Sequence, residues 1–232
     1  MHPLDNVIWQ ALTTRQAHFA QIFNTARRFE REVTSLCAFD EPSAEGYASL
    51  AGLVGERGTS AILLDKPYAP RDGWEHVGGA PLLEMVCENG SANASPSAHV
   101  PEMIELGAQD SPEMVELTAL TKPGPFGTRT HELGYYVGIR DGGKLVAMAG
   151  ERLKVPGYTE VSAVCTHPDH GGKGYARALM LDVMKRIRAR GEKPFLHVRQ
   201  DNTRAVGLYE KLGFETRVVL HYAILRRVTS DS

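Results

Sequence analysis

The sequence predicts an α/β fold, and three features of its second half support that prediction. Short apolar runs of strand character alternate there with segments of helical periodicity. Asp141-Gly142-Gly143 separates two of these runs, which is typical of a β-hairpin turn. A glycine-rich stretch at 171–174 connects another strand pattern with an amphipathic helix pattern.

The first half of the chain holds no spacing of residues that indicates chemistry, so we expect a structural role for it. Helical spacing of Ile8, Leu12, Phe19, Ile22 and Phe23 predicts a helix from about 7 to 29. A second helix is expected at 43–56, with strands at 61–64 and 82–87. The small, polar stretch 88–97 is typical of a linker and divides the chain into 1–95 and 96–232.

The second half is predicted element by element. We expect strands at 103–106, 135–140, 144–151, 160–166, 194–199 and 214–227, and helices ending near 121, 190 and 212. The first of these helices begins either with Asp110 as N-cap, or with Ser111 as N-cap and Pro112 as the first helical residue. Asn202 is expected to cap the last helix, and Gly213 to end it.

Composition excludes several classes of protein. The 232 residues carry 26 Lys and Arg against 28 Asp and Glu, and this near-neutral balance argues against a nucleic-acid partner. No apolar run is long enough for a membrane span, and the first residues lack a signal peptide. The three cysteines, Cys37, Cys87 and Cys165, are typical of buried thiols in a reducing compartment. We therefore expect a cytoplasmic protein.

The segment 167–176 offers backbone donors to an anion. Glycines let successive N–H groups approach a ligand, and the following helix adds the unpaired donors of its first turn. A nucleotide P-loop is excluded, because Lys173 is followed by Gly174 and not by Ser or Thr. A dinucleotide fingerprint also fails, because Arg177 stands at the place of its third glycine. A plain tight turn remains the alternative at this point.

Two blocks in order, Val164 to Ala176 and Asn202 to Phe214, resemble the GCN5-related N-acetyltransferases (GNAT), and within them the FR47-like branch. The resemblance covers 160–214 and extends more weakly back to about residue 100. It implies the acyl-CoA N-acyltransferase fold, a central mixed sheet that splays near 160–199. The residues before 95 would then form an additional, degenerate GNAT-like half that covers one side of the acceptor pocket. A homodimer is left open.

The resemblance implies acetyl-CoA as co-substrate, with its pyrophosphate held by the backbone of a Q/R-x-x-G-x-G/A loop. Gly174 and Ala176 match that loop, whereas Gly171 stands at the Gln/Arg position, so Lys173 or Arg177 is expected to supply the positive charge. The predicted cofactor-binding residues are Val164, Cys165, Thr166, Gly171, Gly172, Lys173, Gly174, Tyr175, Ala176, Arg177 and Asn202.

Tyr209 and Glu160 are the predicted catalytic residues. The resemblance implies that Tyr209 protonates the CoA sulfur and that Asn202 contacts the pantetheine arm; helix packing and a mere N-cap are the alternatives. Glu160 lies eleven residues before Gly171, as the basic glutamate does in histone-acetylating relatives. Apolar neighbours would raise its pKa and suit it to accept a proton. Alternatively it is an exposed strand residue. Ser162 and Thr166 would share its face by alternation.

Other residues give weaker indications. His167 and His170 lack the further ligands of a metal site, and no metal is expected. Cys165 is more typical of a buried thiol than of a covalent nucleophile. The loop 122–129 is either a simple connection or, as in the resembled fold, a wall of the acceptor pocket. In the second case Phe126 and Arg129 would contact the acceptor, Arg129 through a carboxylate.

The function implied is transfer of the acetyl group of acetyl-CoA to a primary amine, by direct attack, on a small molecule or a peptide. Two alternatives stay open: a non-catalytic module that binds or senses acyl-CoA, and an enzyme that uses a longer acyl-CoA. The acceptor cannot be named, because one fold serves many acceptors.

Overall fold

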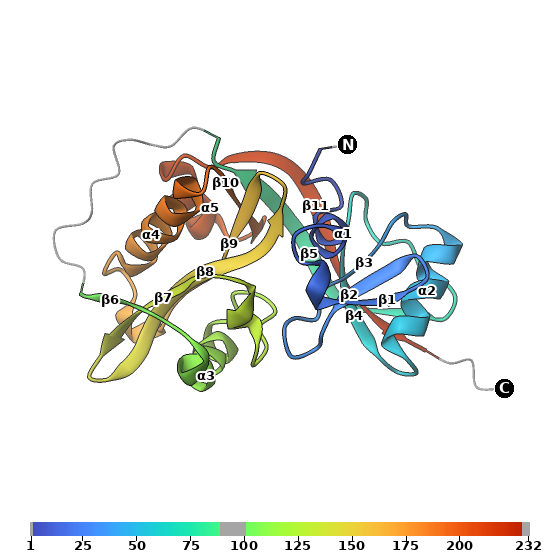
Figure 1. Cartoon of the computed structure of the whole chain (residues 1–232), viewed down its shortest axis with the longest axis horizontal. Helices are drawn as coiled ribbons and strands as arrows, with labels where there is room; N and C mark the ends of the chain where they lie inside the picture. The colour runs from blue at the N-terminus through green and yellow to red at the C-terminus, as the bar shows by residue number, and fades with distance from the viewer. Residues whose placement is uncertain (1, 89–100, 229–232) are drawn as a thin grey trace.

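The computed structural model of the chain describes residues 2–88 and 101–228. These residues form two lobes that share one eight-stranded sheet, in the order β4-β11-β5-β10-β9-β8-β7-β6 (Figure 1). Within it, β9 and β10 are parallel and the other neighbouring strands are antiparallel. The predicted mixed α/β architecture is thus confirmed. The strands are β4 (Thr59–Leu64), β5 (Trp74–Val86), β6 (Met103–Glu105), β7 (Tyr136–Asp141), β8 (Lys144–Val155), β9 (Tyr158–Thr166), β10 (Lys193–Arg199) and β11 (Glu215–Arg227).

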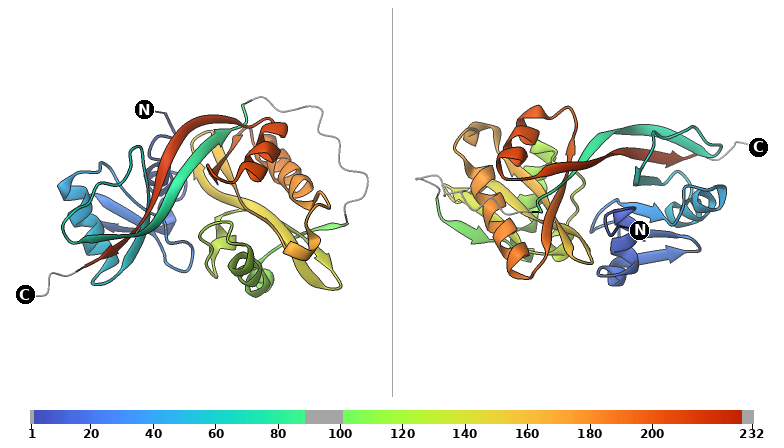
Figure 2. Two further views of the ribbon diagram at one scale, coloured as in Figure 1. Left: turned by 180° about the vertical axis from the view of Figure 1, so that it is seen from behind. Right: turned by 90° about the horizontal axis from the view of Figure 1, so that it is seen from above.

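Three helices cover the sheet in the second lobe. α4 (Tyr175–Ala189) and α5 (Thr203–Lys211) lie on one face, and α3 (Ser111–Thr121) lies on the other (Figures 1 and 2). The apolar stripe of α4 is fully buried against β7, β8, β9 and β10, as its sequence period requires. Asp110 occupies the N-cap position of α3, although its carboxylate accepts a hydrogen bond from the N–H of Gly107 instead. All three helices lie within two residues of their predicted bounds.

The N-terminal lobe differs from the prediction in its first thirty residues. α1 ends at Thr13 (Val7–Thr13), and the chain continues into η1 (Ala17–Phe19) and the hairpin of β1 (Ala20–Phe23) and β2 (Ala26–Phe29). The predicted helix at 7–29 is therefore wrong beyond residue 13. Ile22 and Phe23 do not belong to a buried stripe, because they are 61% and 45% exposed. Asn24, with φ of 46°, makes the turn that reverses the chain.

The predicted helix at 43–56 and strand at 61–64 are present as α2 (Ala44–Val54) and β4, whereas β5 begins eight residues before the predicted strand 82–87 and β3 (Cys37–Phe39) was not predicted. β3 completes a three-stranded sheet with β1 and β2. α2 begins after Ser43, whose hydroxyl accepts a hydrogen bond from the N–H of Gly46 at 3.1 Å. Short 3₁₀ turns connect elements of the second lobe: η2 (Ala108–Asp110), η3 (Thr130–Leu133) and η4 (Pro168–His170).

β5 joins the two lobes, although it precedes the predicted boundary at residue 95. It lies between β10 and β11, so the large sheet takes strands from both sides of that boundary. β5 and β11 run together over thirteen residues each and pass from one lobe into the other (Figure 2). Of the predicted linker 88–97, residues 89–97 lie outside the described residues. The residues on the two sides of the predicted boundary therefore share one sheet.

The sheet opens between β9 and β10. Their parallel pairing covers only Tyr158 to Glu160 against Lys193 to Phe195, and beyond it the two strands separate. β9 also contains a bulge, because Ala163 has φ of 52° and its pairing with β8 shifts by one residue there. Val161 and Val164 consequently pack toward α4, whereas Cys165 packs toward α3.

The bulge corrects one expectation about side-chain direction. Alternation along an unbroken strand would place Thr166 on the same face as Glu160 and Ser162. The extra residue shifts the alternation by one, so Thr166 leaves that face.

Within the described part of the chain, no helix combines the length and the apolar character that crossing a membrane requires.

Candidate functional site

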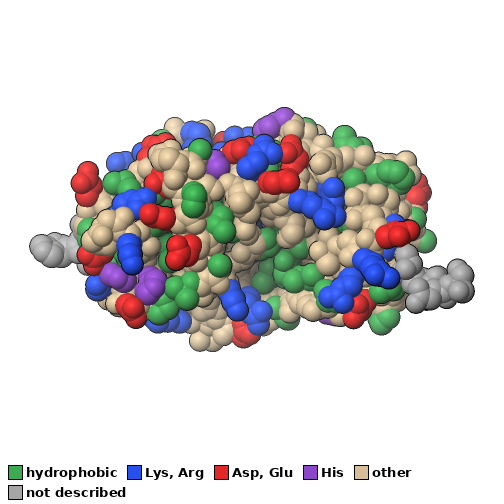
Figure 3. All heavy atoms as spheres, turned by 90° about the horizontal axis from the view of Figure 1, so that it is seen from below, with side chains coloured by type: hydrophobic (Ala, Val, Ile, Leu, Met, Phe, Trp, Pro, Cys, Tyr) green, Lys and Arg blue, Asp and Glu red, His purple; other side chains and the backbone are tan. Residues whose placement is uncertain are grey.

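A cavity of about 940 Å³ lies where β9 and β10 separate. Its walls come from β9, β10, the 122–126 loop after α3 and the start of α5, and the N-terminal lobe closes one side through Ser35, Leu36 and Leu63. Seen from below, the molecule is hollowed near its middle, with hydrophobic side chains inside the hollow (Figure 3). The arrangement gives a partly apolar chamber between the lobes.

The structure brings together one group of the predicted site residues at this cavity. They are Phe126, Val164, Cys165, Thr166, Asn202 and Tyr209. The hydroxyl of Thr166 is buried there without a hydrogen-bond partner among the described residues. An unpaired buried hydroxyl is costly, so this wall favours a polar ligand.

Tyr209 lines the cavity from the inner face of α5. Its ring packs edge-on against Phe214, with 6.2 Å between ring centroids, and the residue is 8% exposed. Burial and the neighbouring Cys165 thiol raise the pKa of Tyr209 to about 12. A phenol in this state is protonated at neutral pH and can donate its hydrogen.

Asn202 has the capping role that the sequence indicates, and it also lines the cavity. Its Oδ1 accepts a hydrogen bond from the N–H of Ala205 at 3.2 Å. Because the carboxamide oxygen accepts the hydrogen bond that caps the helix, the amide nitrogen of Asn202 is the group that can donate to a ligand.

Cys165 is a buried thiol. Burial raises its pKa to about 11, so the thiolate that covalent catalysis needs is scarce at neutral pH. The geometry therefore favours the apolar packing role over the nucleophilic one.

The glycine loop forms a second part of the site and does not line the cavity. Gly172 and Gly174 have φ of 78° and 79°, a backbone region that L-residues with side chains rarely adopt. Gly174 precedes α4, whose first intrahelical bond is Ala178 N–H to Gly174 O. The N–H groups of Tyr175 and Ala176 come before that bond and point out of the helix start, as an anion site requires.

Two members of the predicted loop set behave differently. The N–H of Gly171 donates to the carbonyl of Pro168 at 3.2 Å, so this donor is committed inside η4. Lys173 extends its Nζ to 3.3 Å from His170 Nδ1, which places one positive charge beside the loop.

His170 and His167 lie on this same turn, with 5.8 Å between their ring centroids. His170 Nδ1 is 3.5 Å from the carboxylate of Asp141. Among residues 2–88 and 101–228, His, Cys, Asp and Glu side chains form no group of three able to hold a metal ion.

Glu160 does not have the environment that the sequence suggested. It is neither exposed nor surrounded by apolar groups only: its side chain is 1% exposed and accepts hydrogen bonds from Arg152 Nε at 2.8 Å and Nη2 at 2.7 Å. His197 Nδ1 and the N–H of Leu153 donate to the same carboxylate, at 2.7 and 3.2 Å. Burial would raise the pKa of Glu160, but Arg152 and His197 outweigh it and hold that pKa well below its usual range. The expected rise in pKa is therefore wrong.

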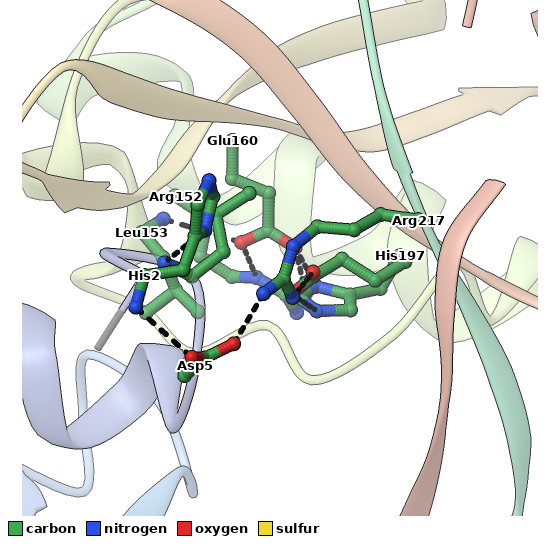
Figure 4. A network of polar contacts seen from close by, with 9 residues as sticks. His2, Asp5, Arg152, Leu153, Glu160, His197 and Arg217 are labelled. Carbon is green, nitrogen blue, oxygen red and sulfur yellow. Dashed lines mark hydrogen bonds and ion pairs between the residues drawn. The ribbon is translucent and has the colours of Figure 1, made fainter. Parts of the chain in front are cut away.

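The Glu160–Arg152 pair belongs to a wider polar network that reaches the surface at Asp5 (Figure 4). His197 Nε2 lies 3.4 Å from Glu84, and Arg217 links Glu84 at 2.7 Å to Asp5 of the N-terminal segment. Burial lowers the pKa of His197, but the carboxylates of Glu160 and Glu84 outweigh it and raise this pKa to about 9. With His197 protonated, the three cations and three carboxylates of the network balance.

Arg129 also departs from its predicted role. Its guanidinium pairs with Glu132 at 2.7 Å and with Glu30, and its N–H donates to the carbonyl of Glu32 at 2.8 Å. It does not line the cavity. Arg129 therefore ties η3 to the N-terminal lobe and is not placed to bind an acceptor.

Sequence reasoning missed several polar residues of the cavity, among them Arg152, His197 and Tyr222. One signal was present for the first of them. Pro156-Gly157 separates two strand patterns, and a hairpin turn there places Arg152 and Glu160 on facing strands. His197 and Tyr222 reach the site through pairings between strands distant in sequence, which no local pattern reveals.

Comparisons with known proteins agree with this geometry. A family model described as FR47-like protein matches residues 136–223. A solved structure from Novosphingobium aromaticivorans, described as an acetyltransferase of the GNAT family, is 35% identical, with 99% of this chain and 100% of that chain covered and a TM-score of 0.88. A GCN5-related N-acetyltransferase-like protein from Streptococcus suis shares the fold at 16% identity, with 97% and 94% covered and a TM-score of 0.61.

Two curated relatives match only part of this chain. N-alpha-acetyltransferase RimI of Mycobacterium tuberculosis is 39% identical over 84 residues, which are 35% of this chain and 52% of that protein. An acetyltransferase of Yersinia pestis is 46% identical over 52 residues, 22% of this chain and 37% of that protein. The chain thus matches about half, or less, of the length of these curated relatives.

Proposed function

Because this chain belongs to the GNAT family of acetyltransferases, in its FR47-like branch, we propose that it transfers the acetyl group of acetyl-CoA to the primary amine of a small acceptor by direct attack. The observation that carries the proposal is the cavity at the separation of β9 and β10, with the phenol of Tyr209 on its wall. A catalytic acid must lie within reach of the reacting atoms, and this cavity is where they have room.

The loop and the cavity divide the binding of acetyl-CoA between them. Tyr175 and Ala176 offer backbone donors to the pyrophosphate at the start of α4, and Lys173 adds a positive charge nearby. Val164, Thr166 and Asn202 line the opened sheet, where backbone and side-chain polar groups suit the amides of a pantetheine arm.

Tyr209 is assigned as the general acid. When the neutral amine attacks the thioester carbonyl, the new C–N bond forms, the C–S bond breaks, and the departing thiolate takes the phenolic proton of Tyr209. The proton that the new amide nitrogen loses then returns to the Tyr209 phenolate, which regenerates the acid. The raised pKa keeps the phenol protonated at neutral pH before the sulfur leaves.

Glu160 is assigned as a positioning residue and not as the proton acceptor. A carboxylate whose pKa is held low by Arg152 and His197 is a weak base. Its bidentate contact instead fixes the guanidinium of Arg152 at the cavity wall.

The three cysteines are buried and form no disulfide among the described residues, which favours a reducing compartment, and we place the protein in the cytoplasm on this basis. A longer acyl donor remains an alternative co-substrate that the same cavity could hold.

A screen of primary amines with acetyl-CoA tests the function, with free thiol release measured continuously and the acetylated product identified by mass. Turnover of any amine, reduced in the Tyr209→Phe protein, supports the enzyme. Tight CoA binding by calorimetry, with no turnover across the screen, would instead favour the sensing module.

A further inference from the structure

Arg152 is a buried cation on the wall of the cavity. It lies on β8 next to Leu153, and its side chain is 12% exposed. Its Nη1 faces the 122–126 loop, since a Cβ added at Gly124 would lie 3.5 Å from that atom. Three other basic side chains, Lys122, Arg199 and Arg204, line the cavity from exposed positions, where solvent screens their charge.

The guanidinium of Arg152 retains a second donor face. Glu160 occupies the side formed by Nε and Nη2, which leaves the Nη1 amino group and the other Nη2 hydrogen. Nη1 has no acceptor among the described residues. A free end-on fork of this kind fits a carboxylate with two parallel hydrogen bonds.

Charge is distributed unevenly across the network behind this wall. Arg152 and the protonated His197 line the cavity, whereas Glu160 and Glu84 lie behind them, 0% exposed as whole residues. No Asp or Glu is found among the described lining residues. The cavity therefore presents the positive side of a network that is neutral as a whole, and a carboxylate is favoured there.

The same wall acts on the amine. A neighbouring positive charge disfavours an ammonium group, so an amine bound beside Arg152 and His197 gives up its proton more readily than in water. An acceptor with an ammonium group alone would be repelled, whereas a carboxylate on the same molecule offsets that repulsion. The positive charges of Arg152 and His197 thus favour both an acceptor with a carboxylate and deprotonation of its amine.

Much of the neighbouring cavity wall is apolar. It includes Leu36, Leu63, Leu82 and Leu153, together with Tyr222. Burial raises the pKa of Tyr222, and the nearby guanidinium of Arg152 opposes that rise. Such a surface suits a hydrocarbon side chain and not a second charge.

We propose that the acceptor is an amine that also carries a carboxylate and an apolar side chain, as in an apolar amino acid, and that Arg152 binds this carboxylate. The inference rests on the proposed acetyl transfer and names its substrate class.

Matched acceptor pairs test this with the full-length chain and acetyl-CoA: L-leucine against L-leucinamide, and L-phenylalanine against L-phenylalaninamide. We expect kcat/KM for the carboxylate to exceed that for the amide by about 10- to 100-fold, the usual worth of a hydrogen-bonded charge pair. Arg152→Gln should bring the ratio close to one while KM for acetyl-CoA stays constant. The double variant Arg152→Gln with Glu160→Gln removes both charges of the pair. It replaces Arg152→Gln in this test if the single variant does not fold.

Arg129→Gln is the matched control, because Arg129 is an ion-paired arginine outside the cavity. It should keep the preference of the unaltered chain. Equal use of acid and amide by the unaltered chain would overturn the inference but leave acetyl transfer standing. A preference for phosphoethanolamine, or for a peptide with an amidated C-terminus, would also overturn it.

Binding of the products separates this inference from the proposed function. N-acetyl-L-leucine and N-acetyl-L-leucinamide can be titrated calorimetrically in the presence of CoA, which needs no turnover. Tighter binding of the acid supports the carboxylate contact even if no amine is acetylated. Equal binding of the two counts against it.

Discussion

Glu160 and Arg152 face each other across the hairpin of β8 and β9, with two hydrogen bonds of 2.7 and 2.8 Å between carboxylate and guanidinium. The pair is buried, so neither charge is tolerated without the other. This contact separates the two interpretations of Glu160: a proton acceptor needs freedom and a raised pKa, whereas a positioning group needs a fixed partner.

Replacing Glu160 with Gln leaves Arg152 and His197 without their shared counter-charge. We expect the free energy of unfolding to fall by about 3–5 kcal/mol, as when one partner of a buried ion pair is removed. KM for the acceptor should rise, while the acidic limb of the kcat–pH profile stays where it is. Chemical denaturation and pH-dependent kinetics measure both effects. Loss of the acidic limb with an unchanged acceptor KM would restore Glu160 as the general base.

Replacing Tyr209 with Phe keeps the packing against Phe214 and removes only the hydroxyl. We expect kcat to fall by about 10²-fold or more, while KM for acetyl-CoA changes little. Because the pKa of Tyr209 is about 12, this phenol should produce no alkaline limb below about pH 10. Tyr47→Phe, at a buried tyrosine outside the cavity, is the control. Unchanged kcat in the Tyr209 variant would remove the general acid.

His197 gives the protein a stability that depends on pH. Its pKa is raised from 6.5 to about 9, so its charge favours the folded state fully below about pH 6.5. This contribution is lost as the pH rises through about 9, at lower pH than the buried thiols Cys37 and Cys165 titrate. We expect Tm to decrease over this window and the decrease to flatten in His197→Gln. Thermal scans at constant ionic strength measure it, and parallel curves for the two proteins would contradict the ion-pair assignment.

Gly174→Val tests whether the loop binds CoA, with a second variant to control for the effect of backbone strain. A β-branched residue at φ of 79° strains the backbone and brings a side chain to the start of α4. Gly157 has φ of 80° in the open turn between β8 and β9, so Gly157→Val carries similar strain away from the loop. We expect both variants to lose stability and only Gly174→Val to lose CoA affinity, by tenfold or more in calorimetry. Equal CoA affinity in the two folded variants would argue against the loop as the pyrophosphate site.

The local sequence predicts most helices and strands of the second lobe, because these elements begin and end at residues typical of turns and helix caps. Gly142 and Gly143 turn the hairpin of β7 and β8, and Asn202 caps α5 where the sequence places it. The N-terminal helix was overextended because Phe19 and Ile22 continue the helical period of α1 by coincidence. Phe19 instead lies in η1, and Ile22 lies in β1, which pairs with β2 through contacts that local spacing does not encode.

The sequence predicts several residues of the site correctly but does not predict the contacts that surround Glu160. Tyr209 and Thr166 do line the cavity, whereas Glu160 meets Arg152 and His197 through strand pairings. The pKa of Glu160 depends on Arg152 and His197. The apolar residues next to Glu160 in the sequence do not reveal these two cations. The bulge at Ala163 likewise reverses the direction of the side chains that follow it in β9. An alanine does not indicate a bulge, so the sequence does not predict this reversal.

The position of β5 has a consequence for how the protein is made. β5 leaves the ribosome early, yet its two sheet neighbours, β10 and β11, are translated after nearly all of the second lobe. Tyr222 on β11 also forms part of the cavity wall. A nascent chain therefore carries β5 with both edges unpaired until β10 and β11 have been synthesised. We expect binding of chaperones to the nascent chain during this interval, and loss of folding when β11 is deleted.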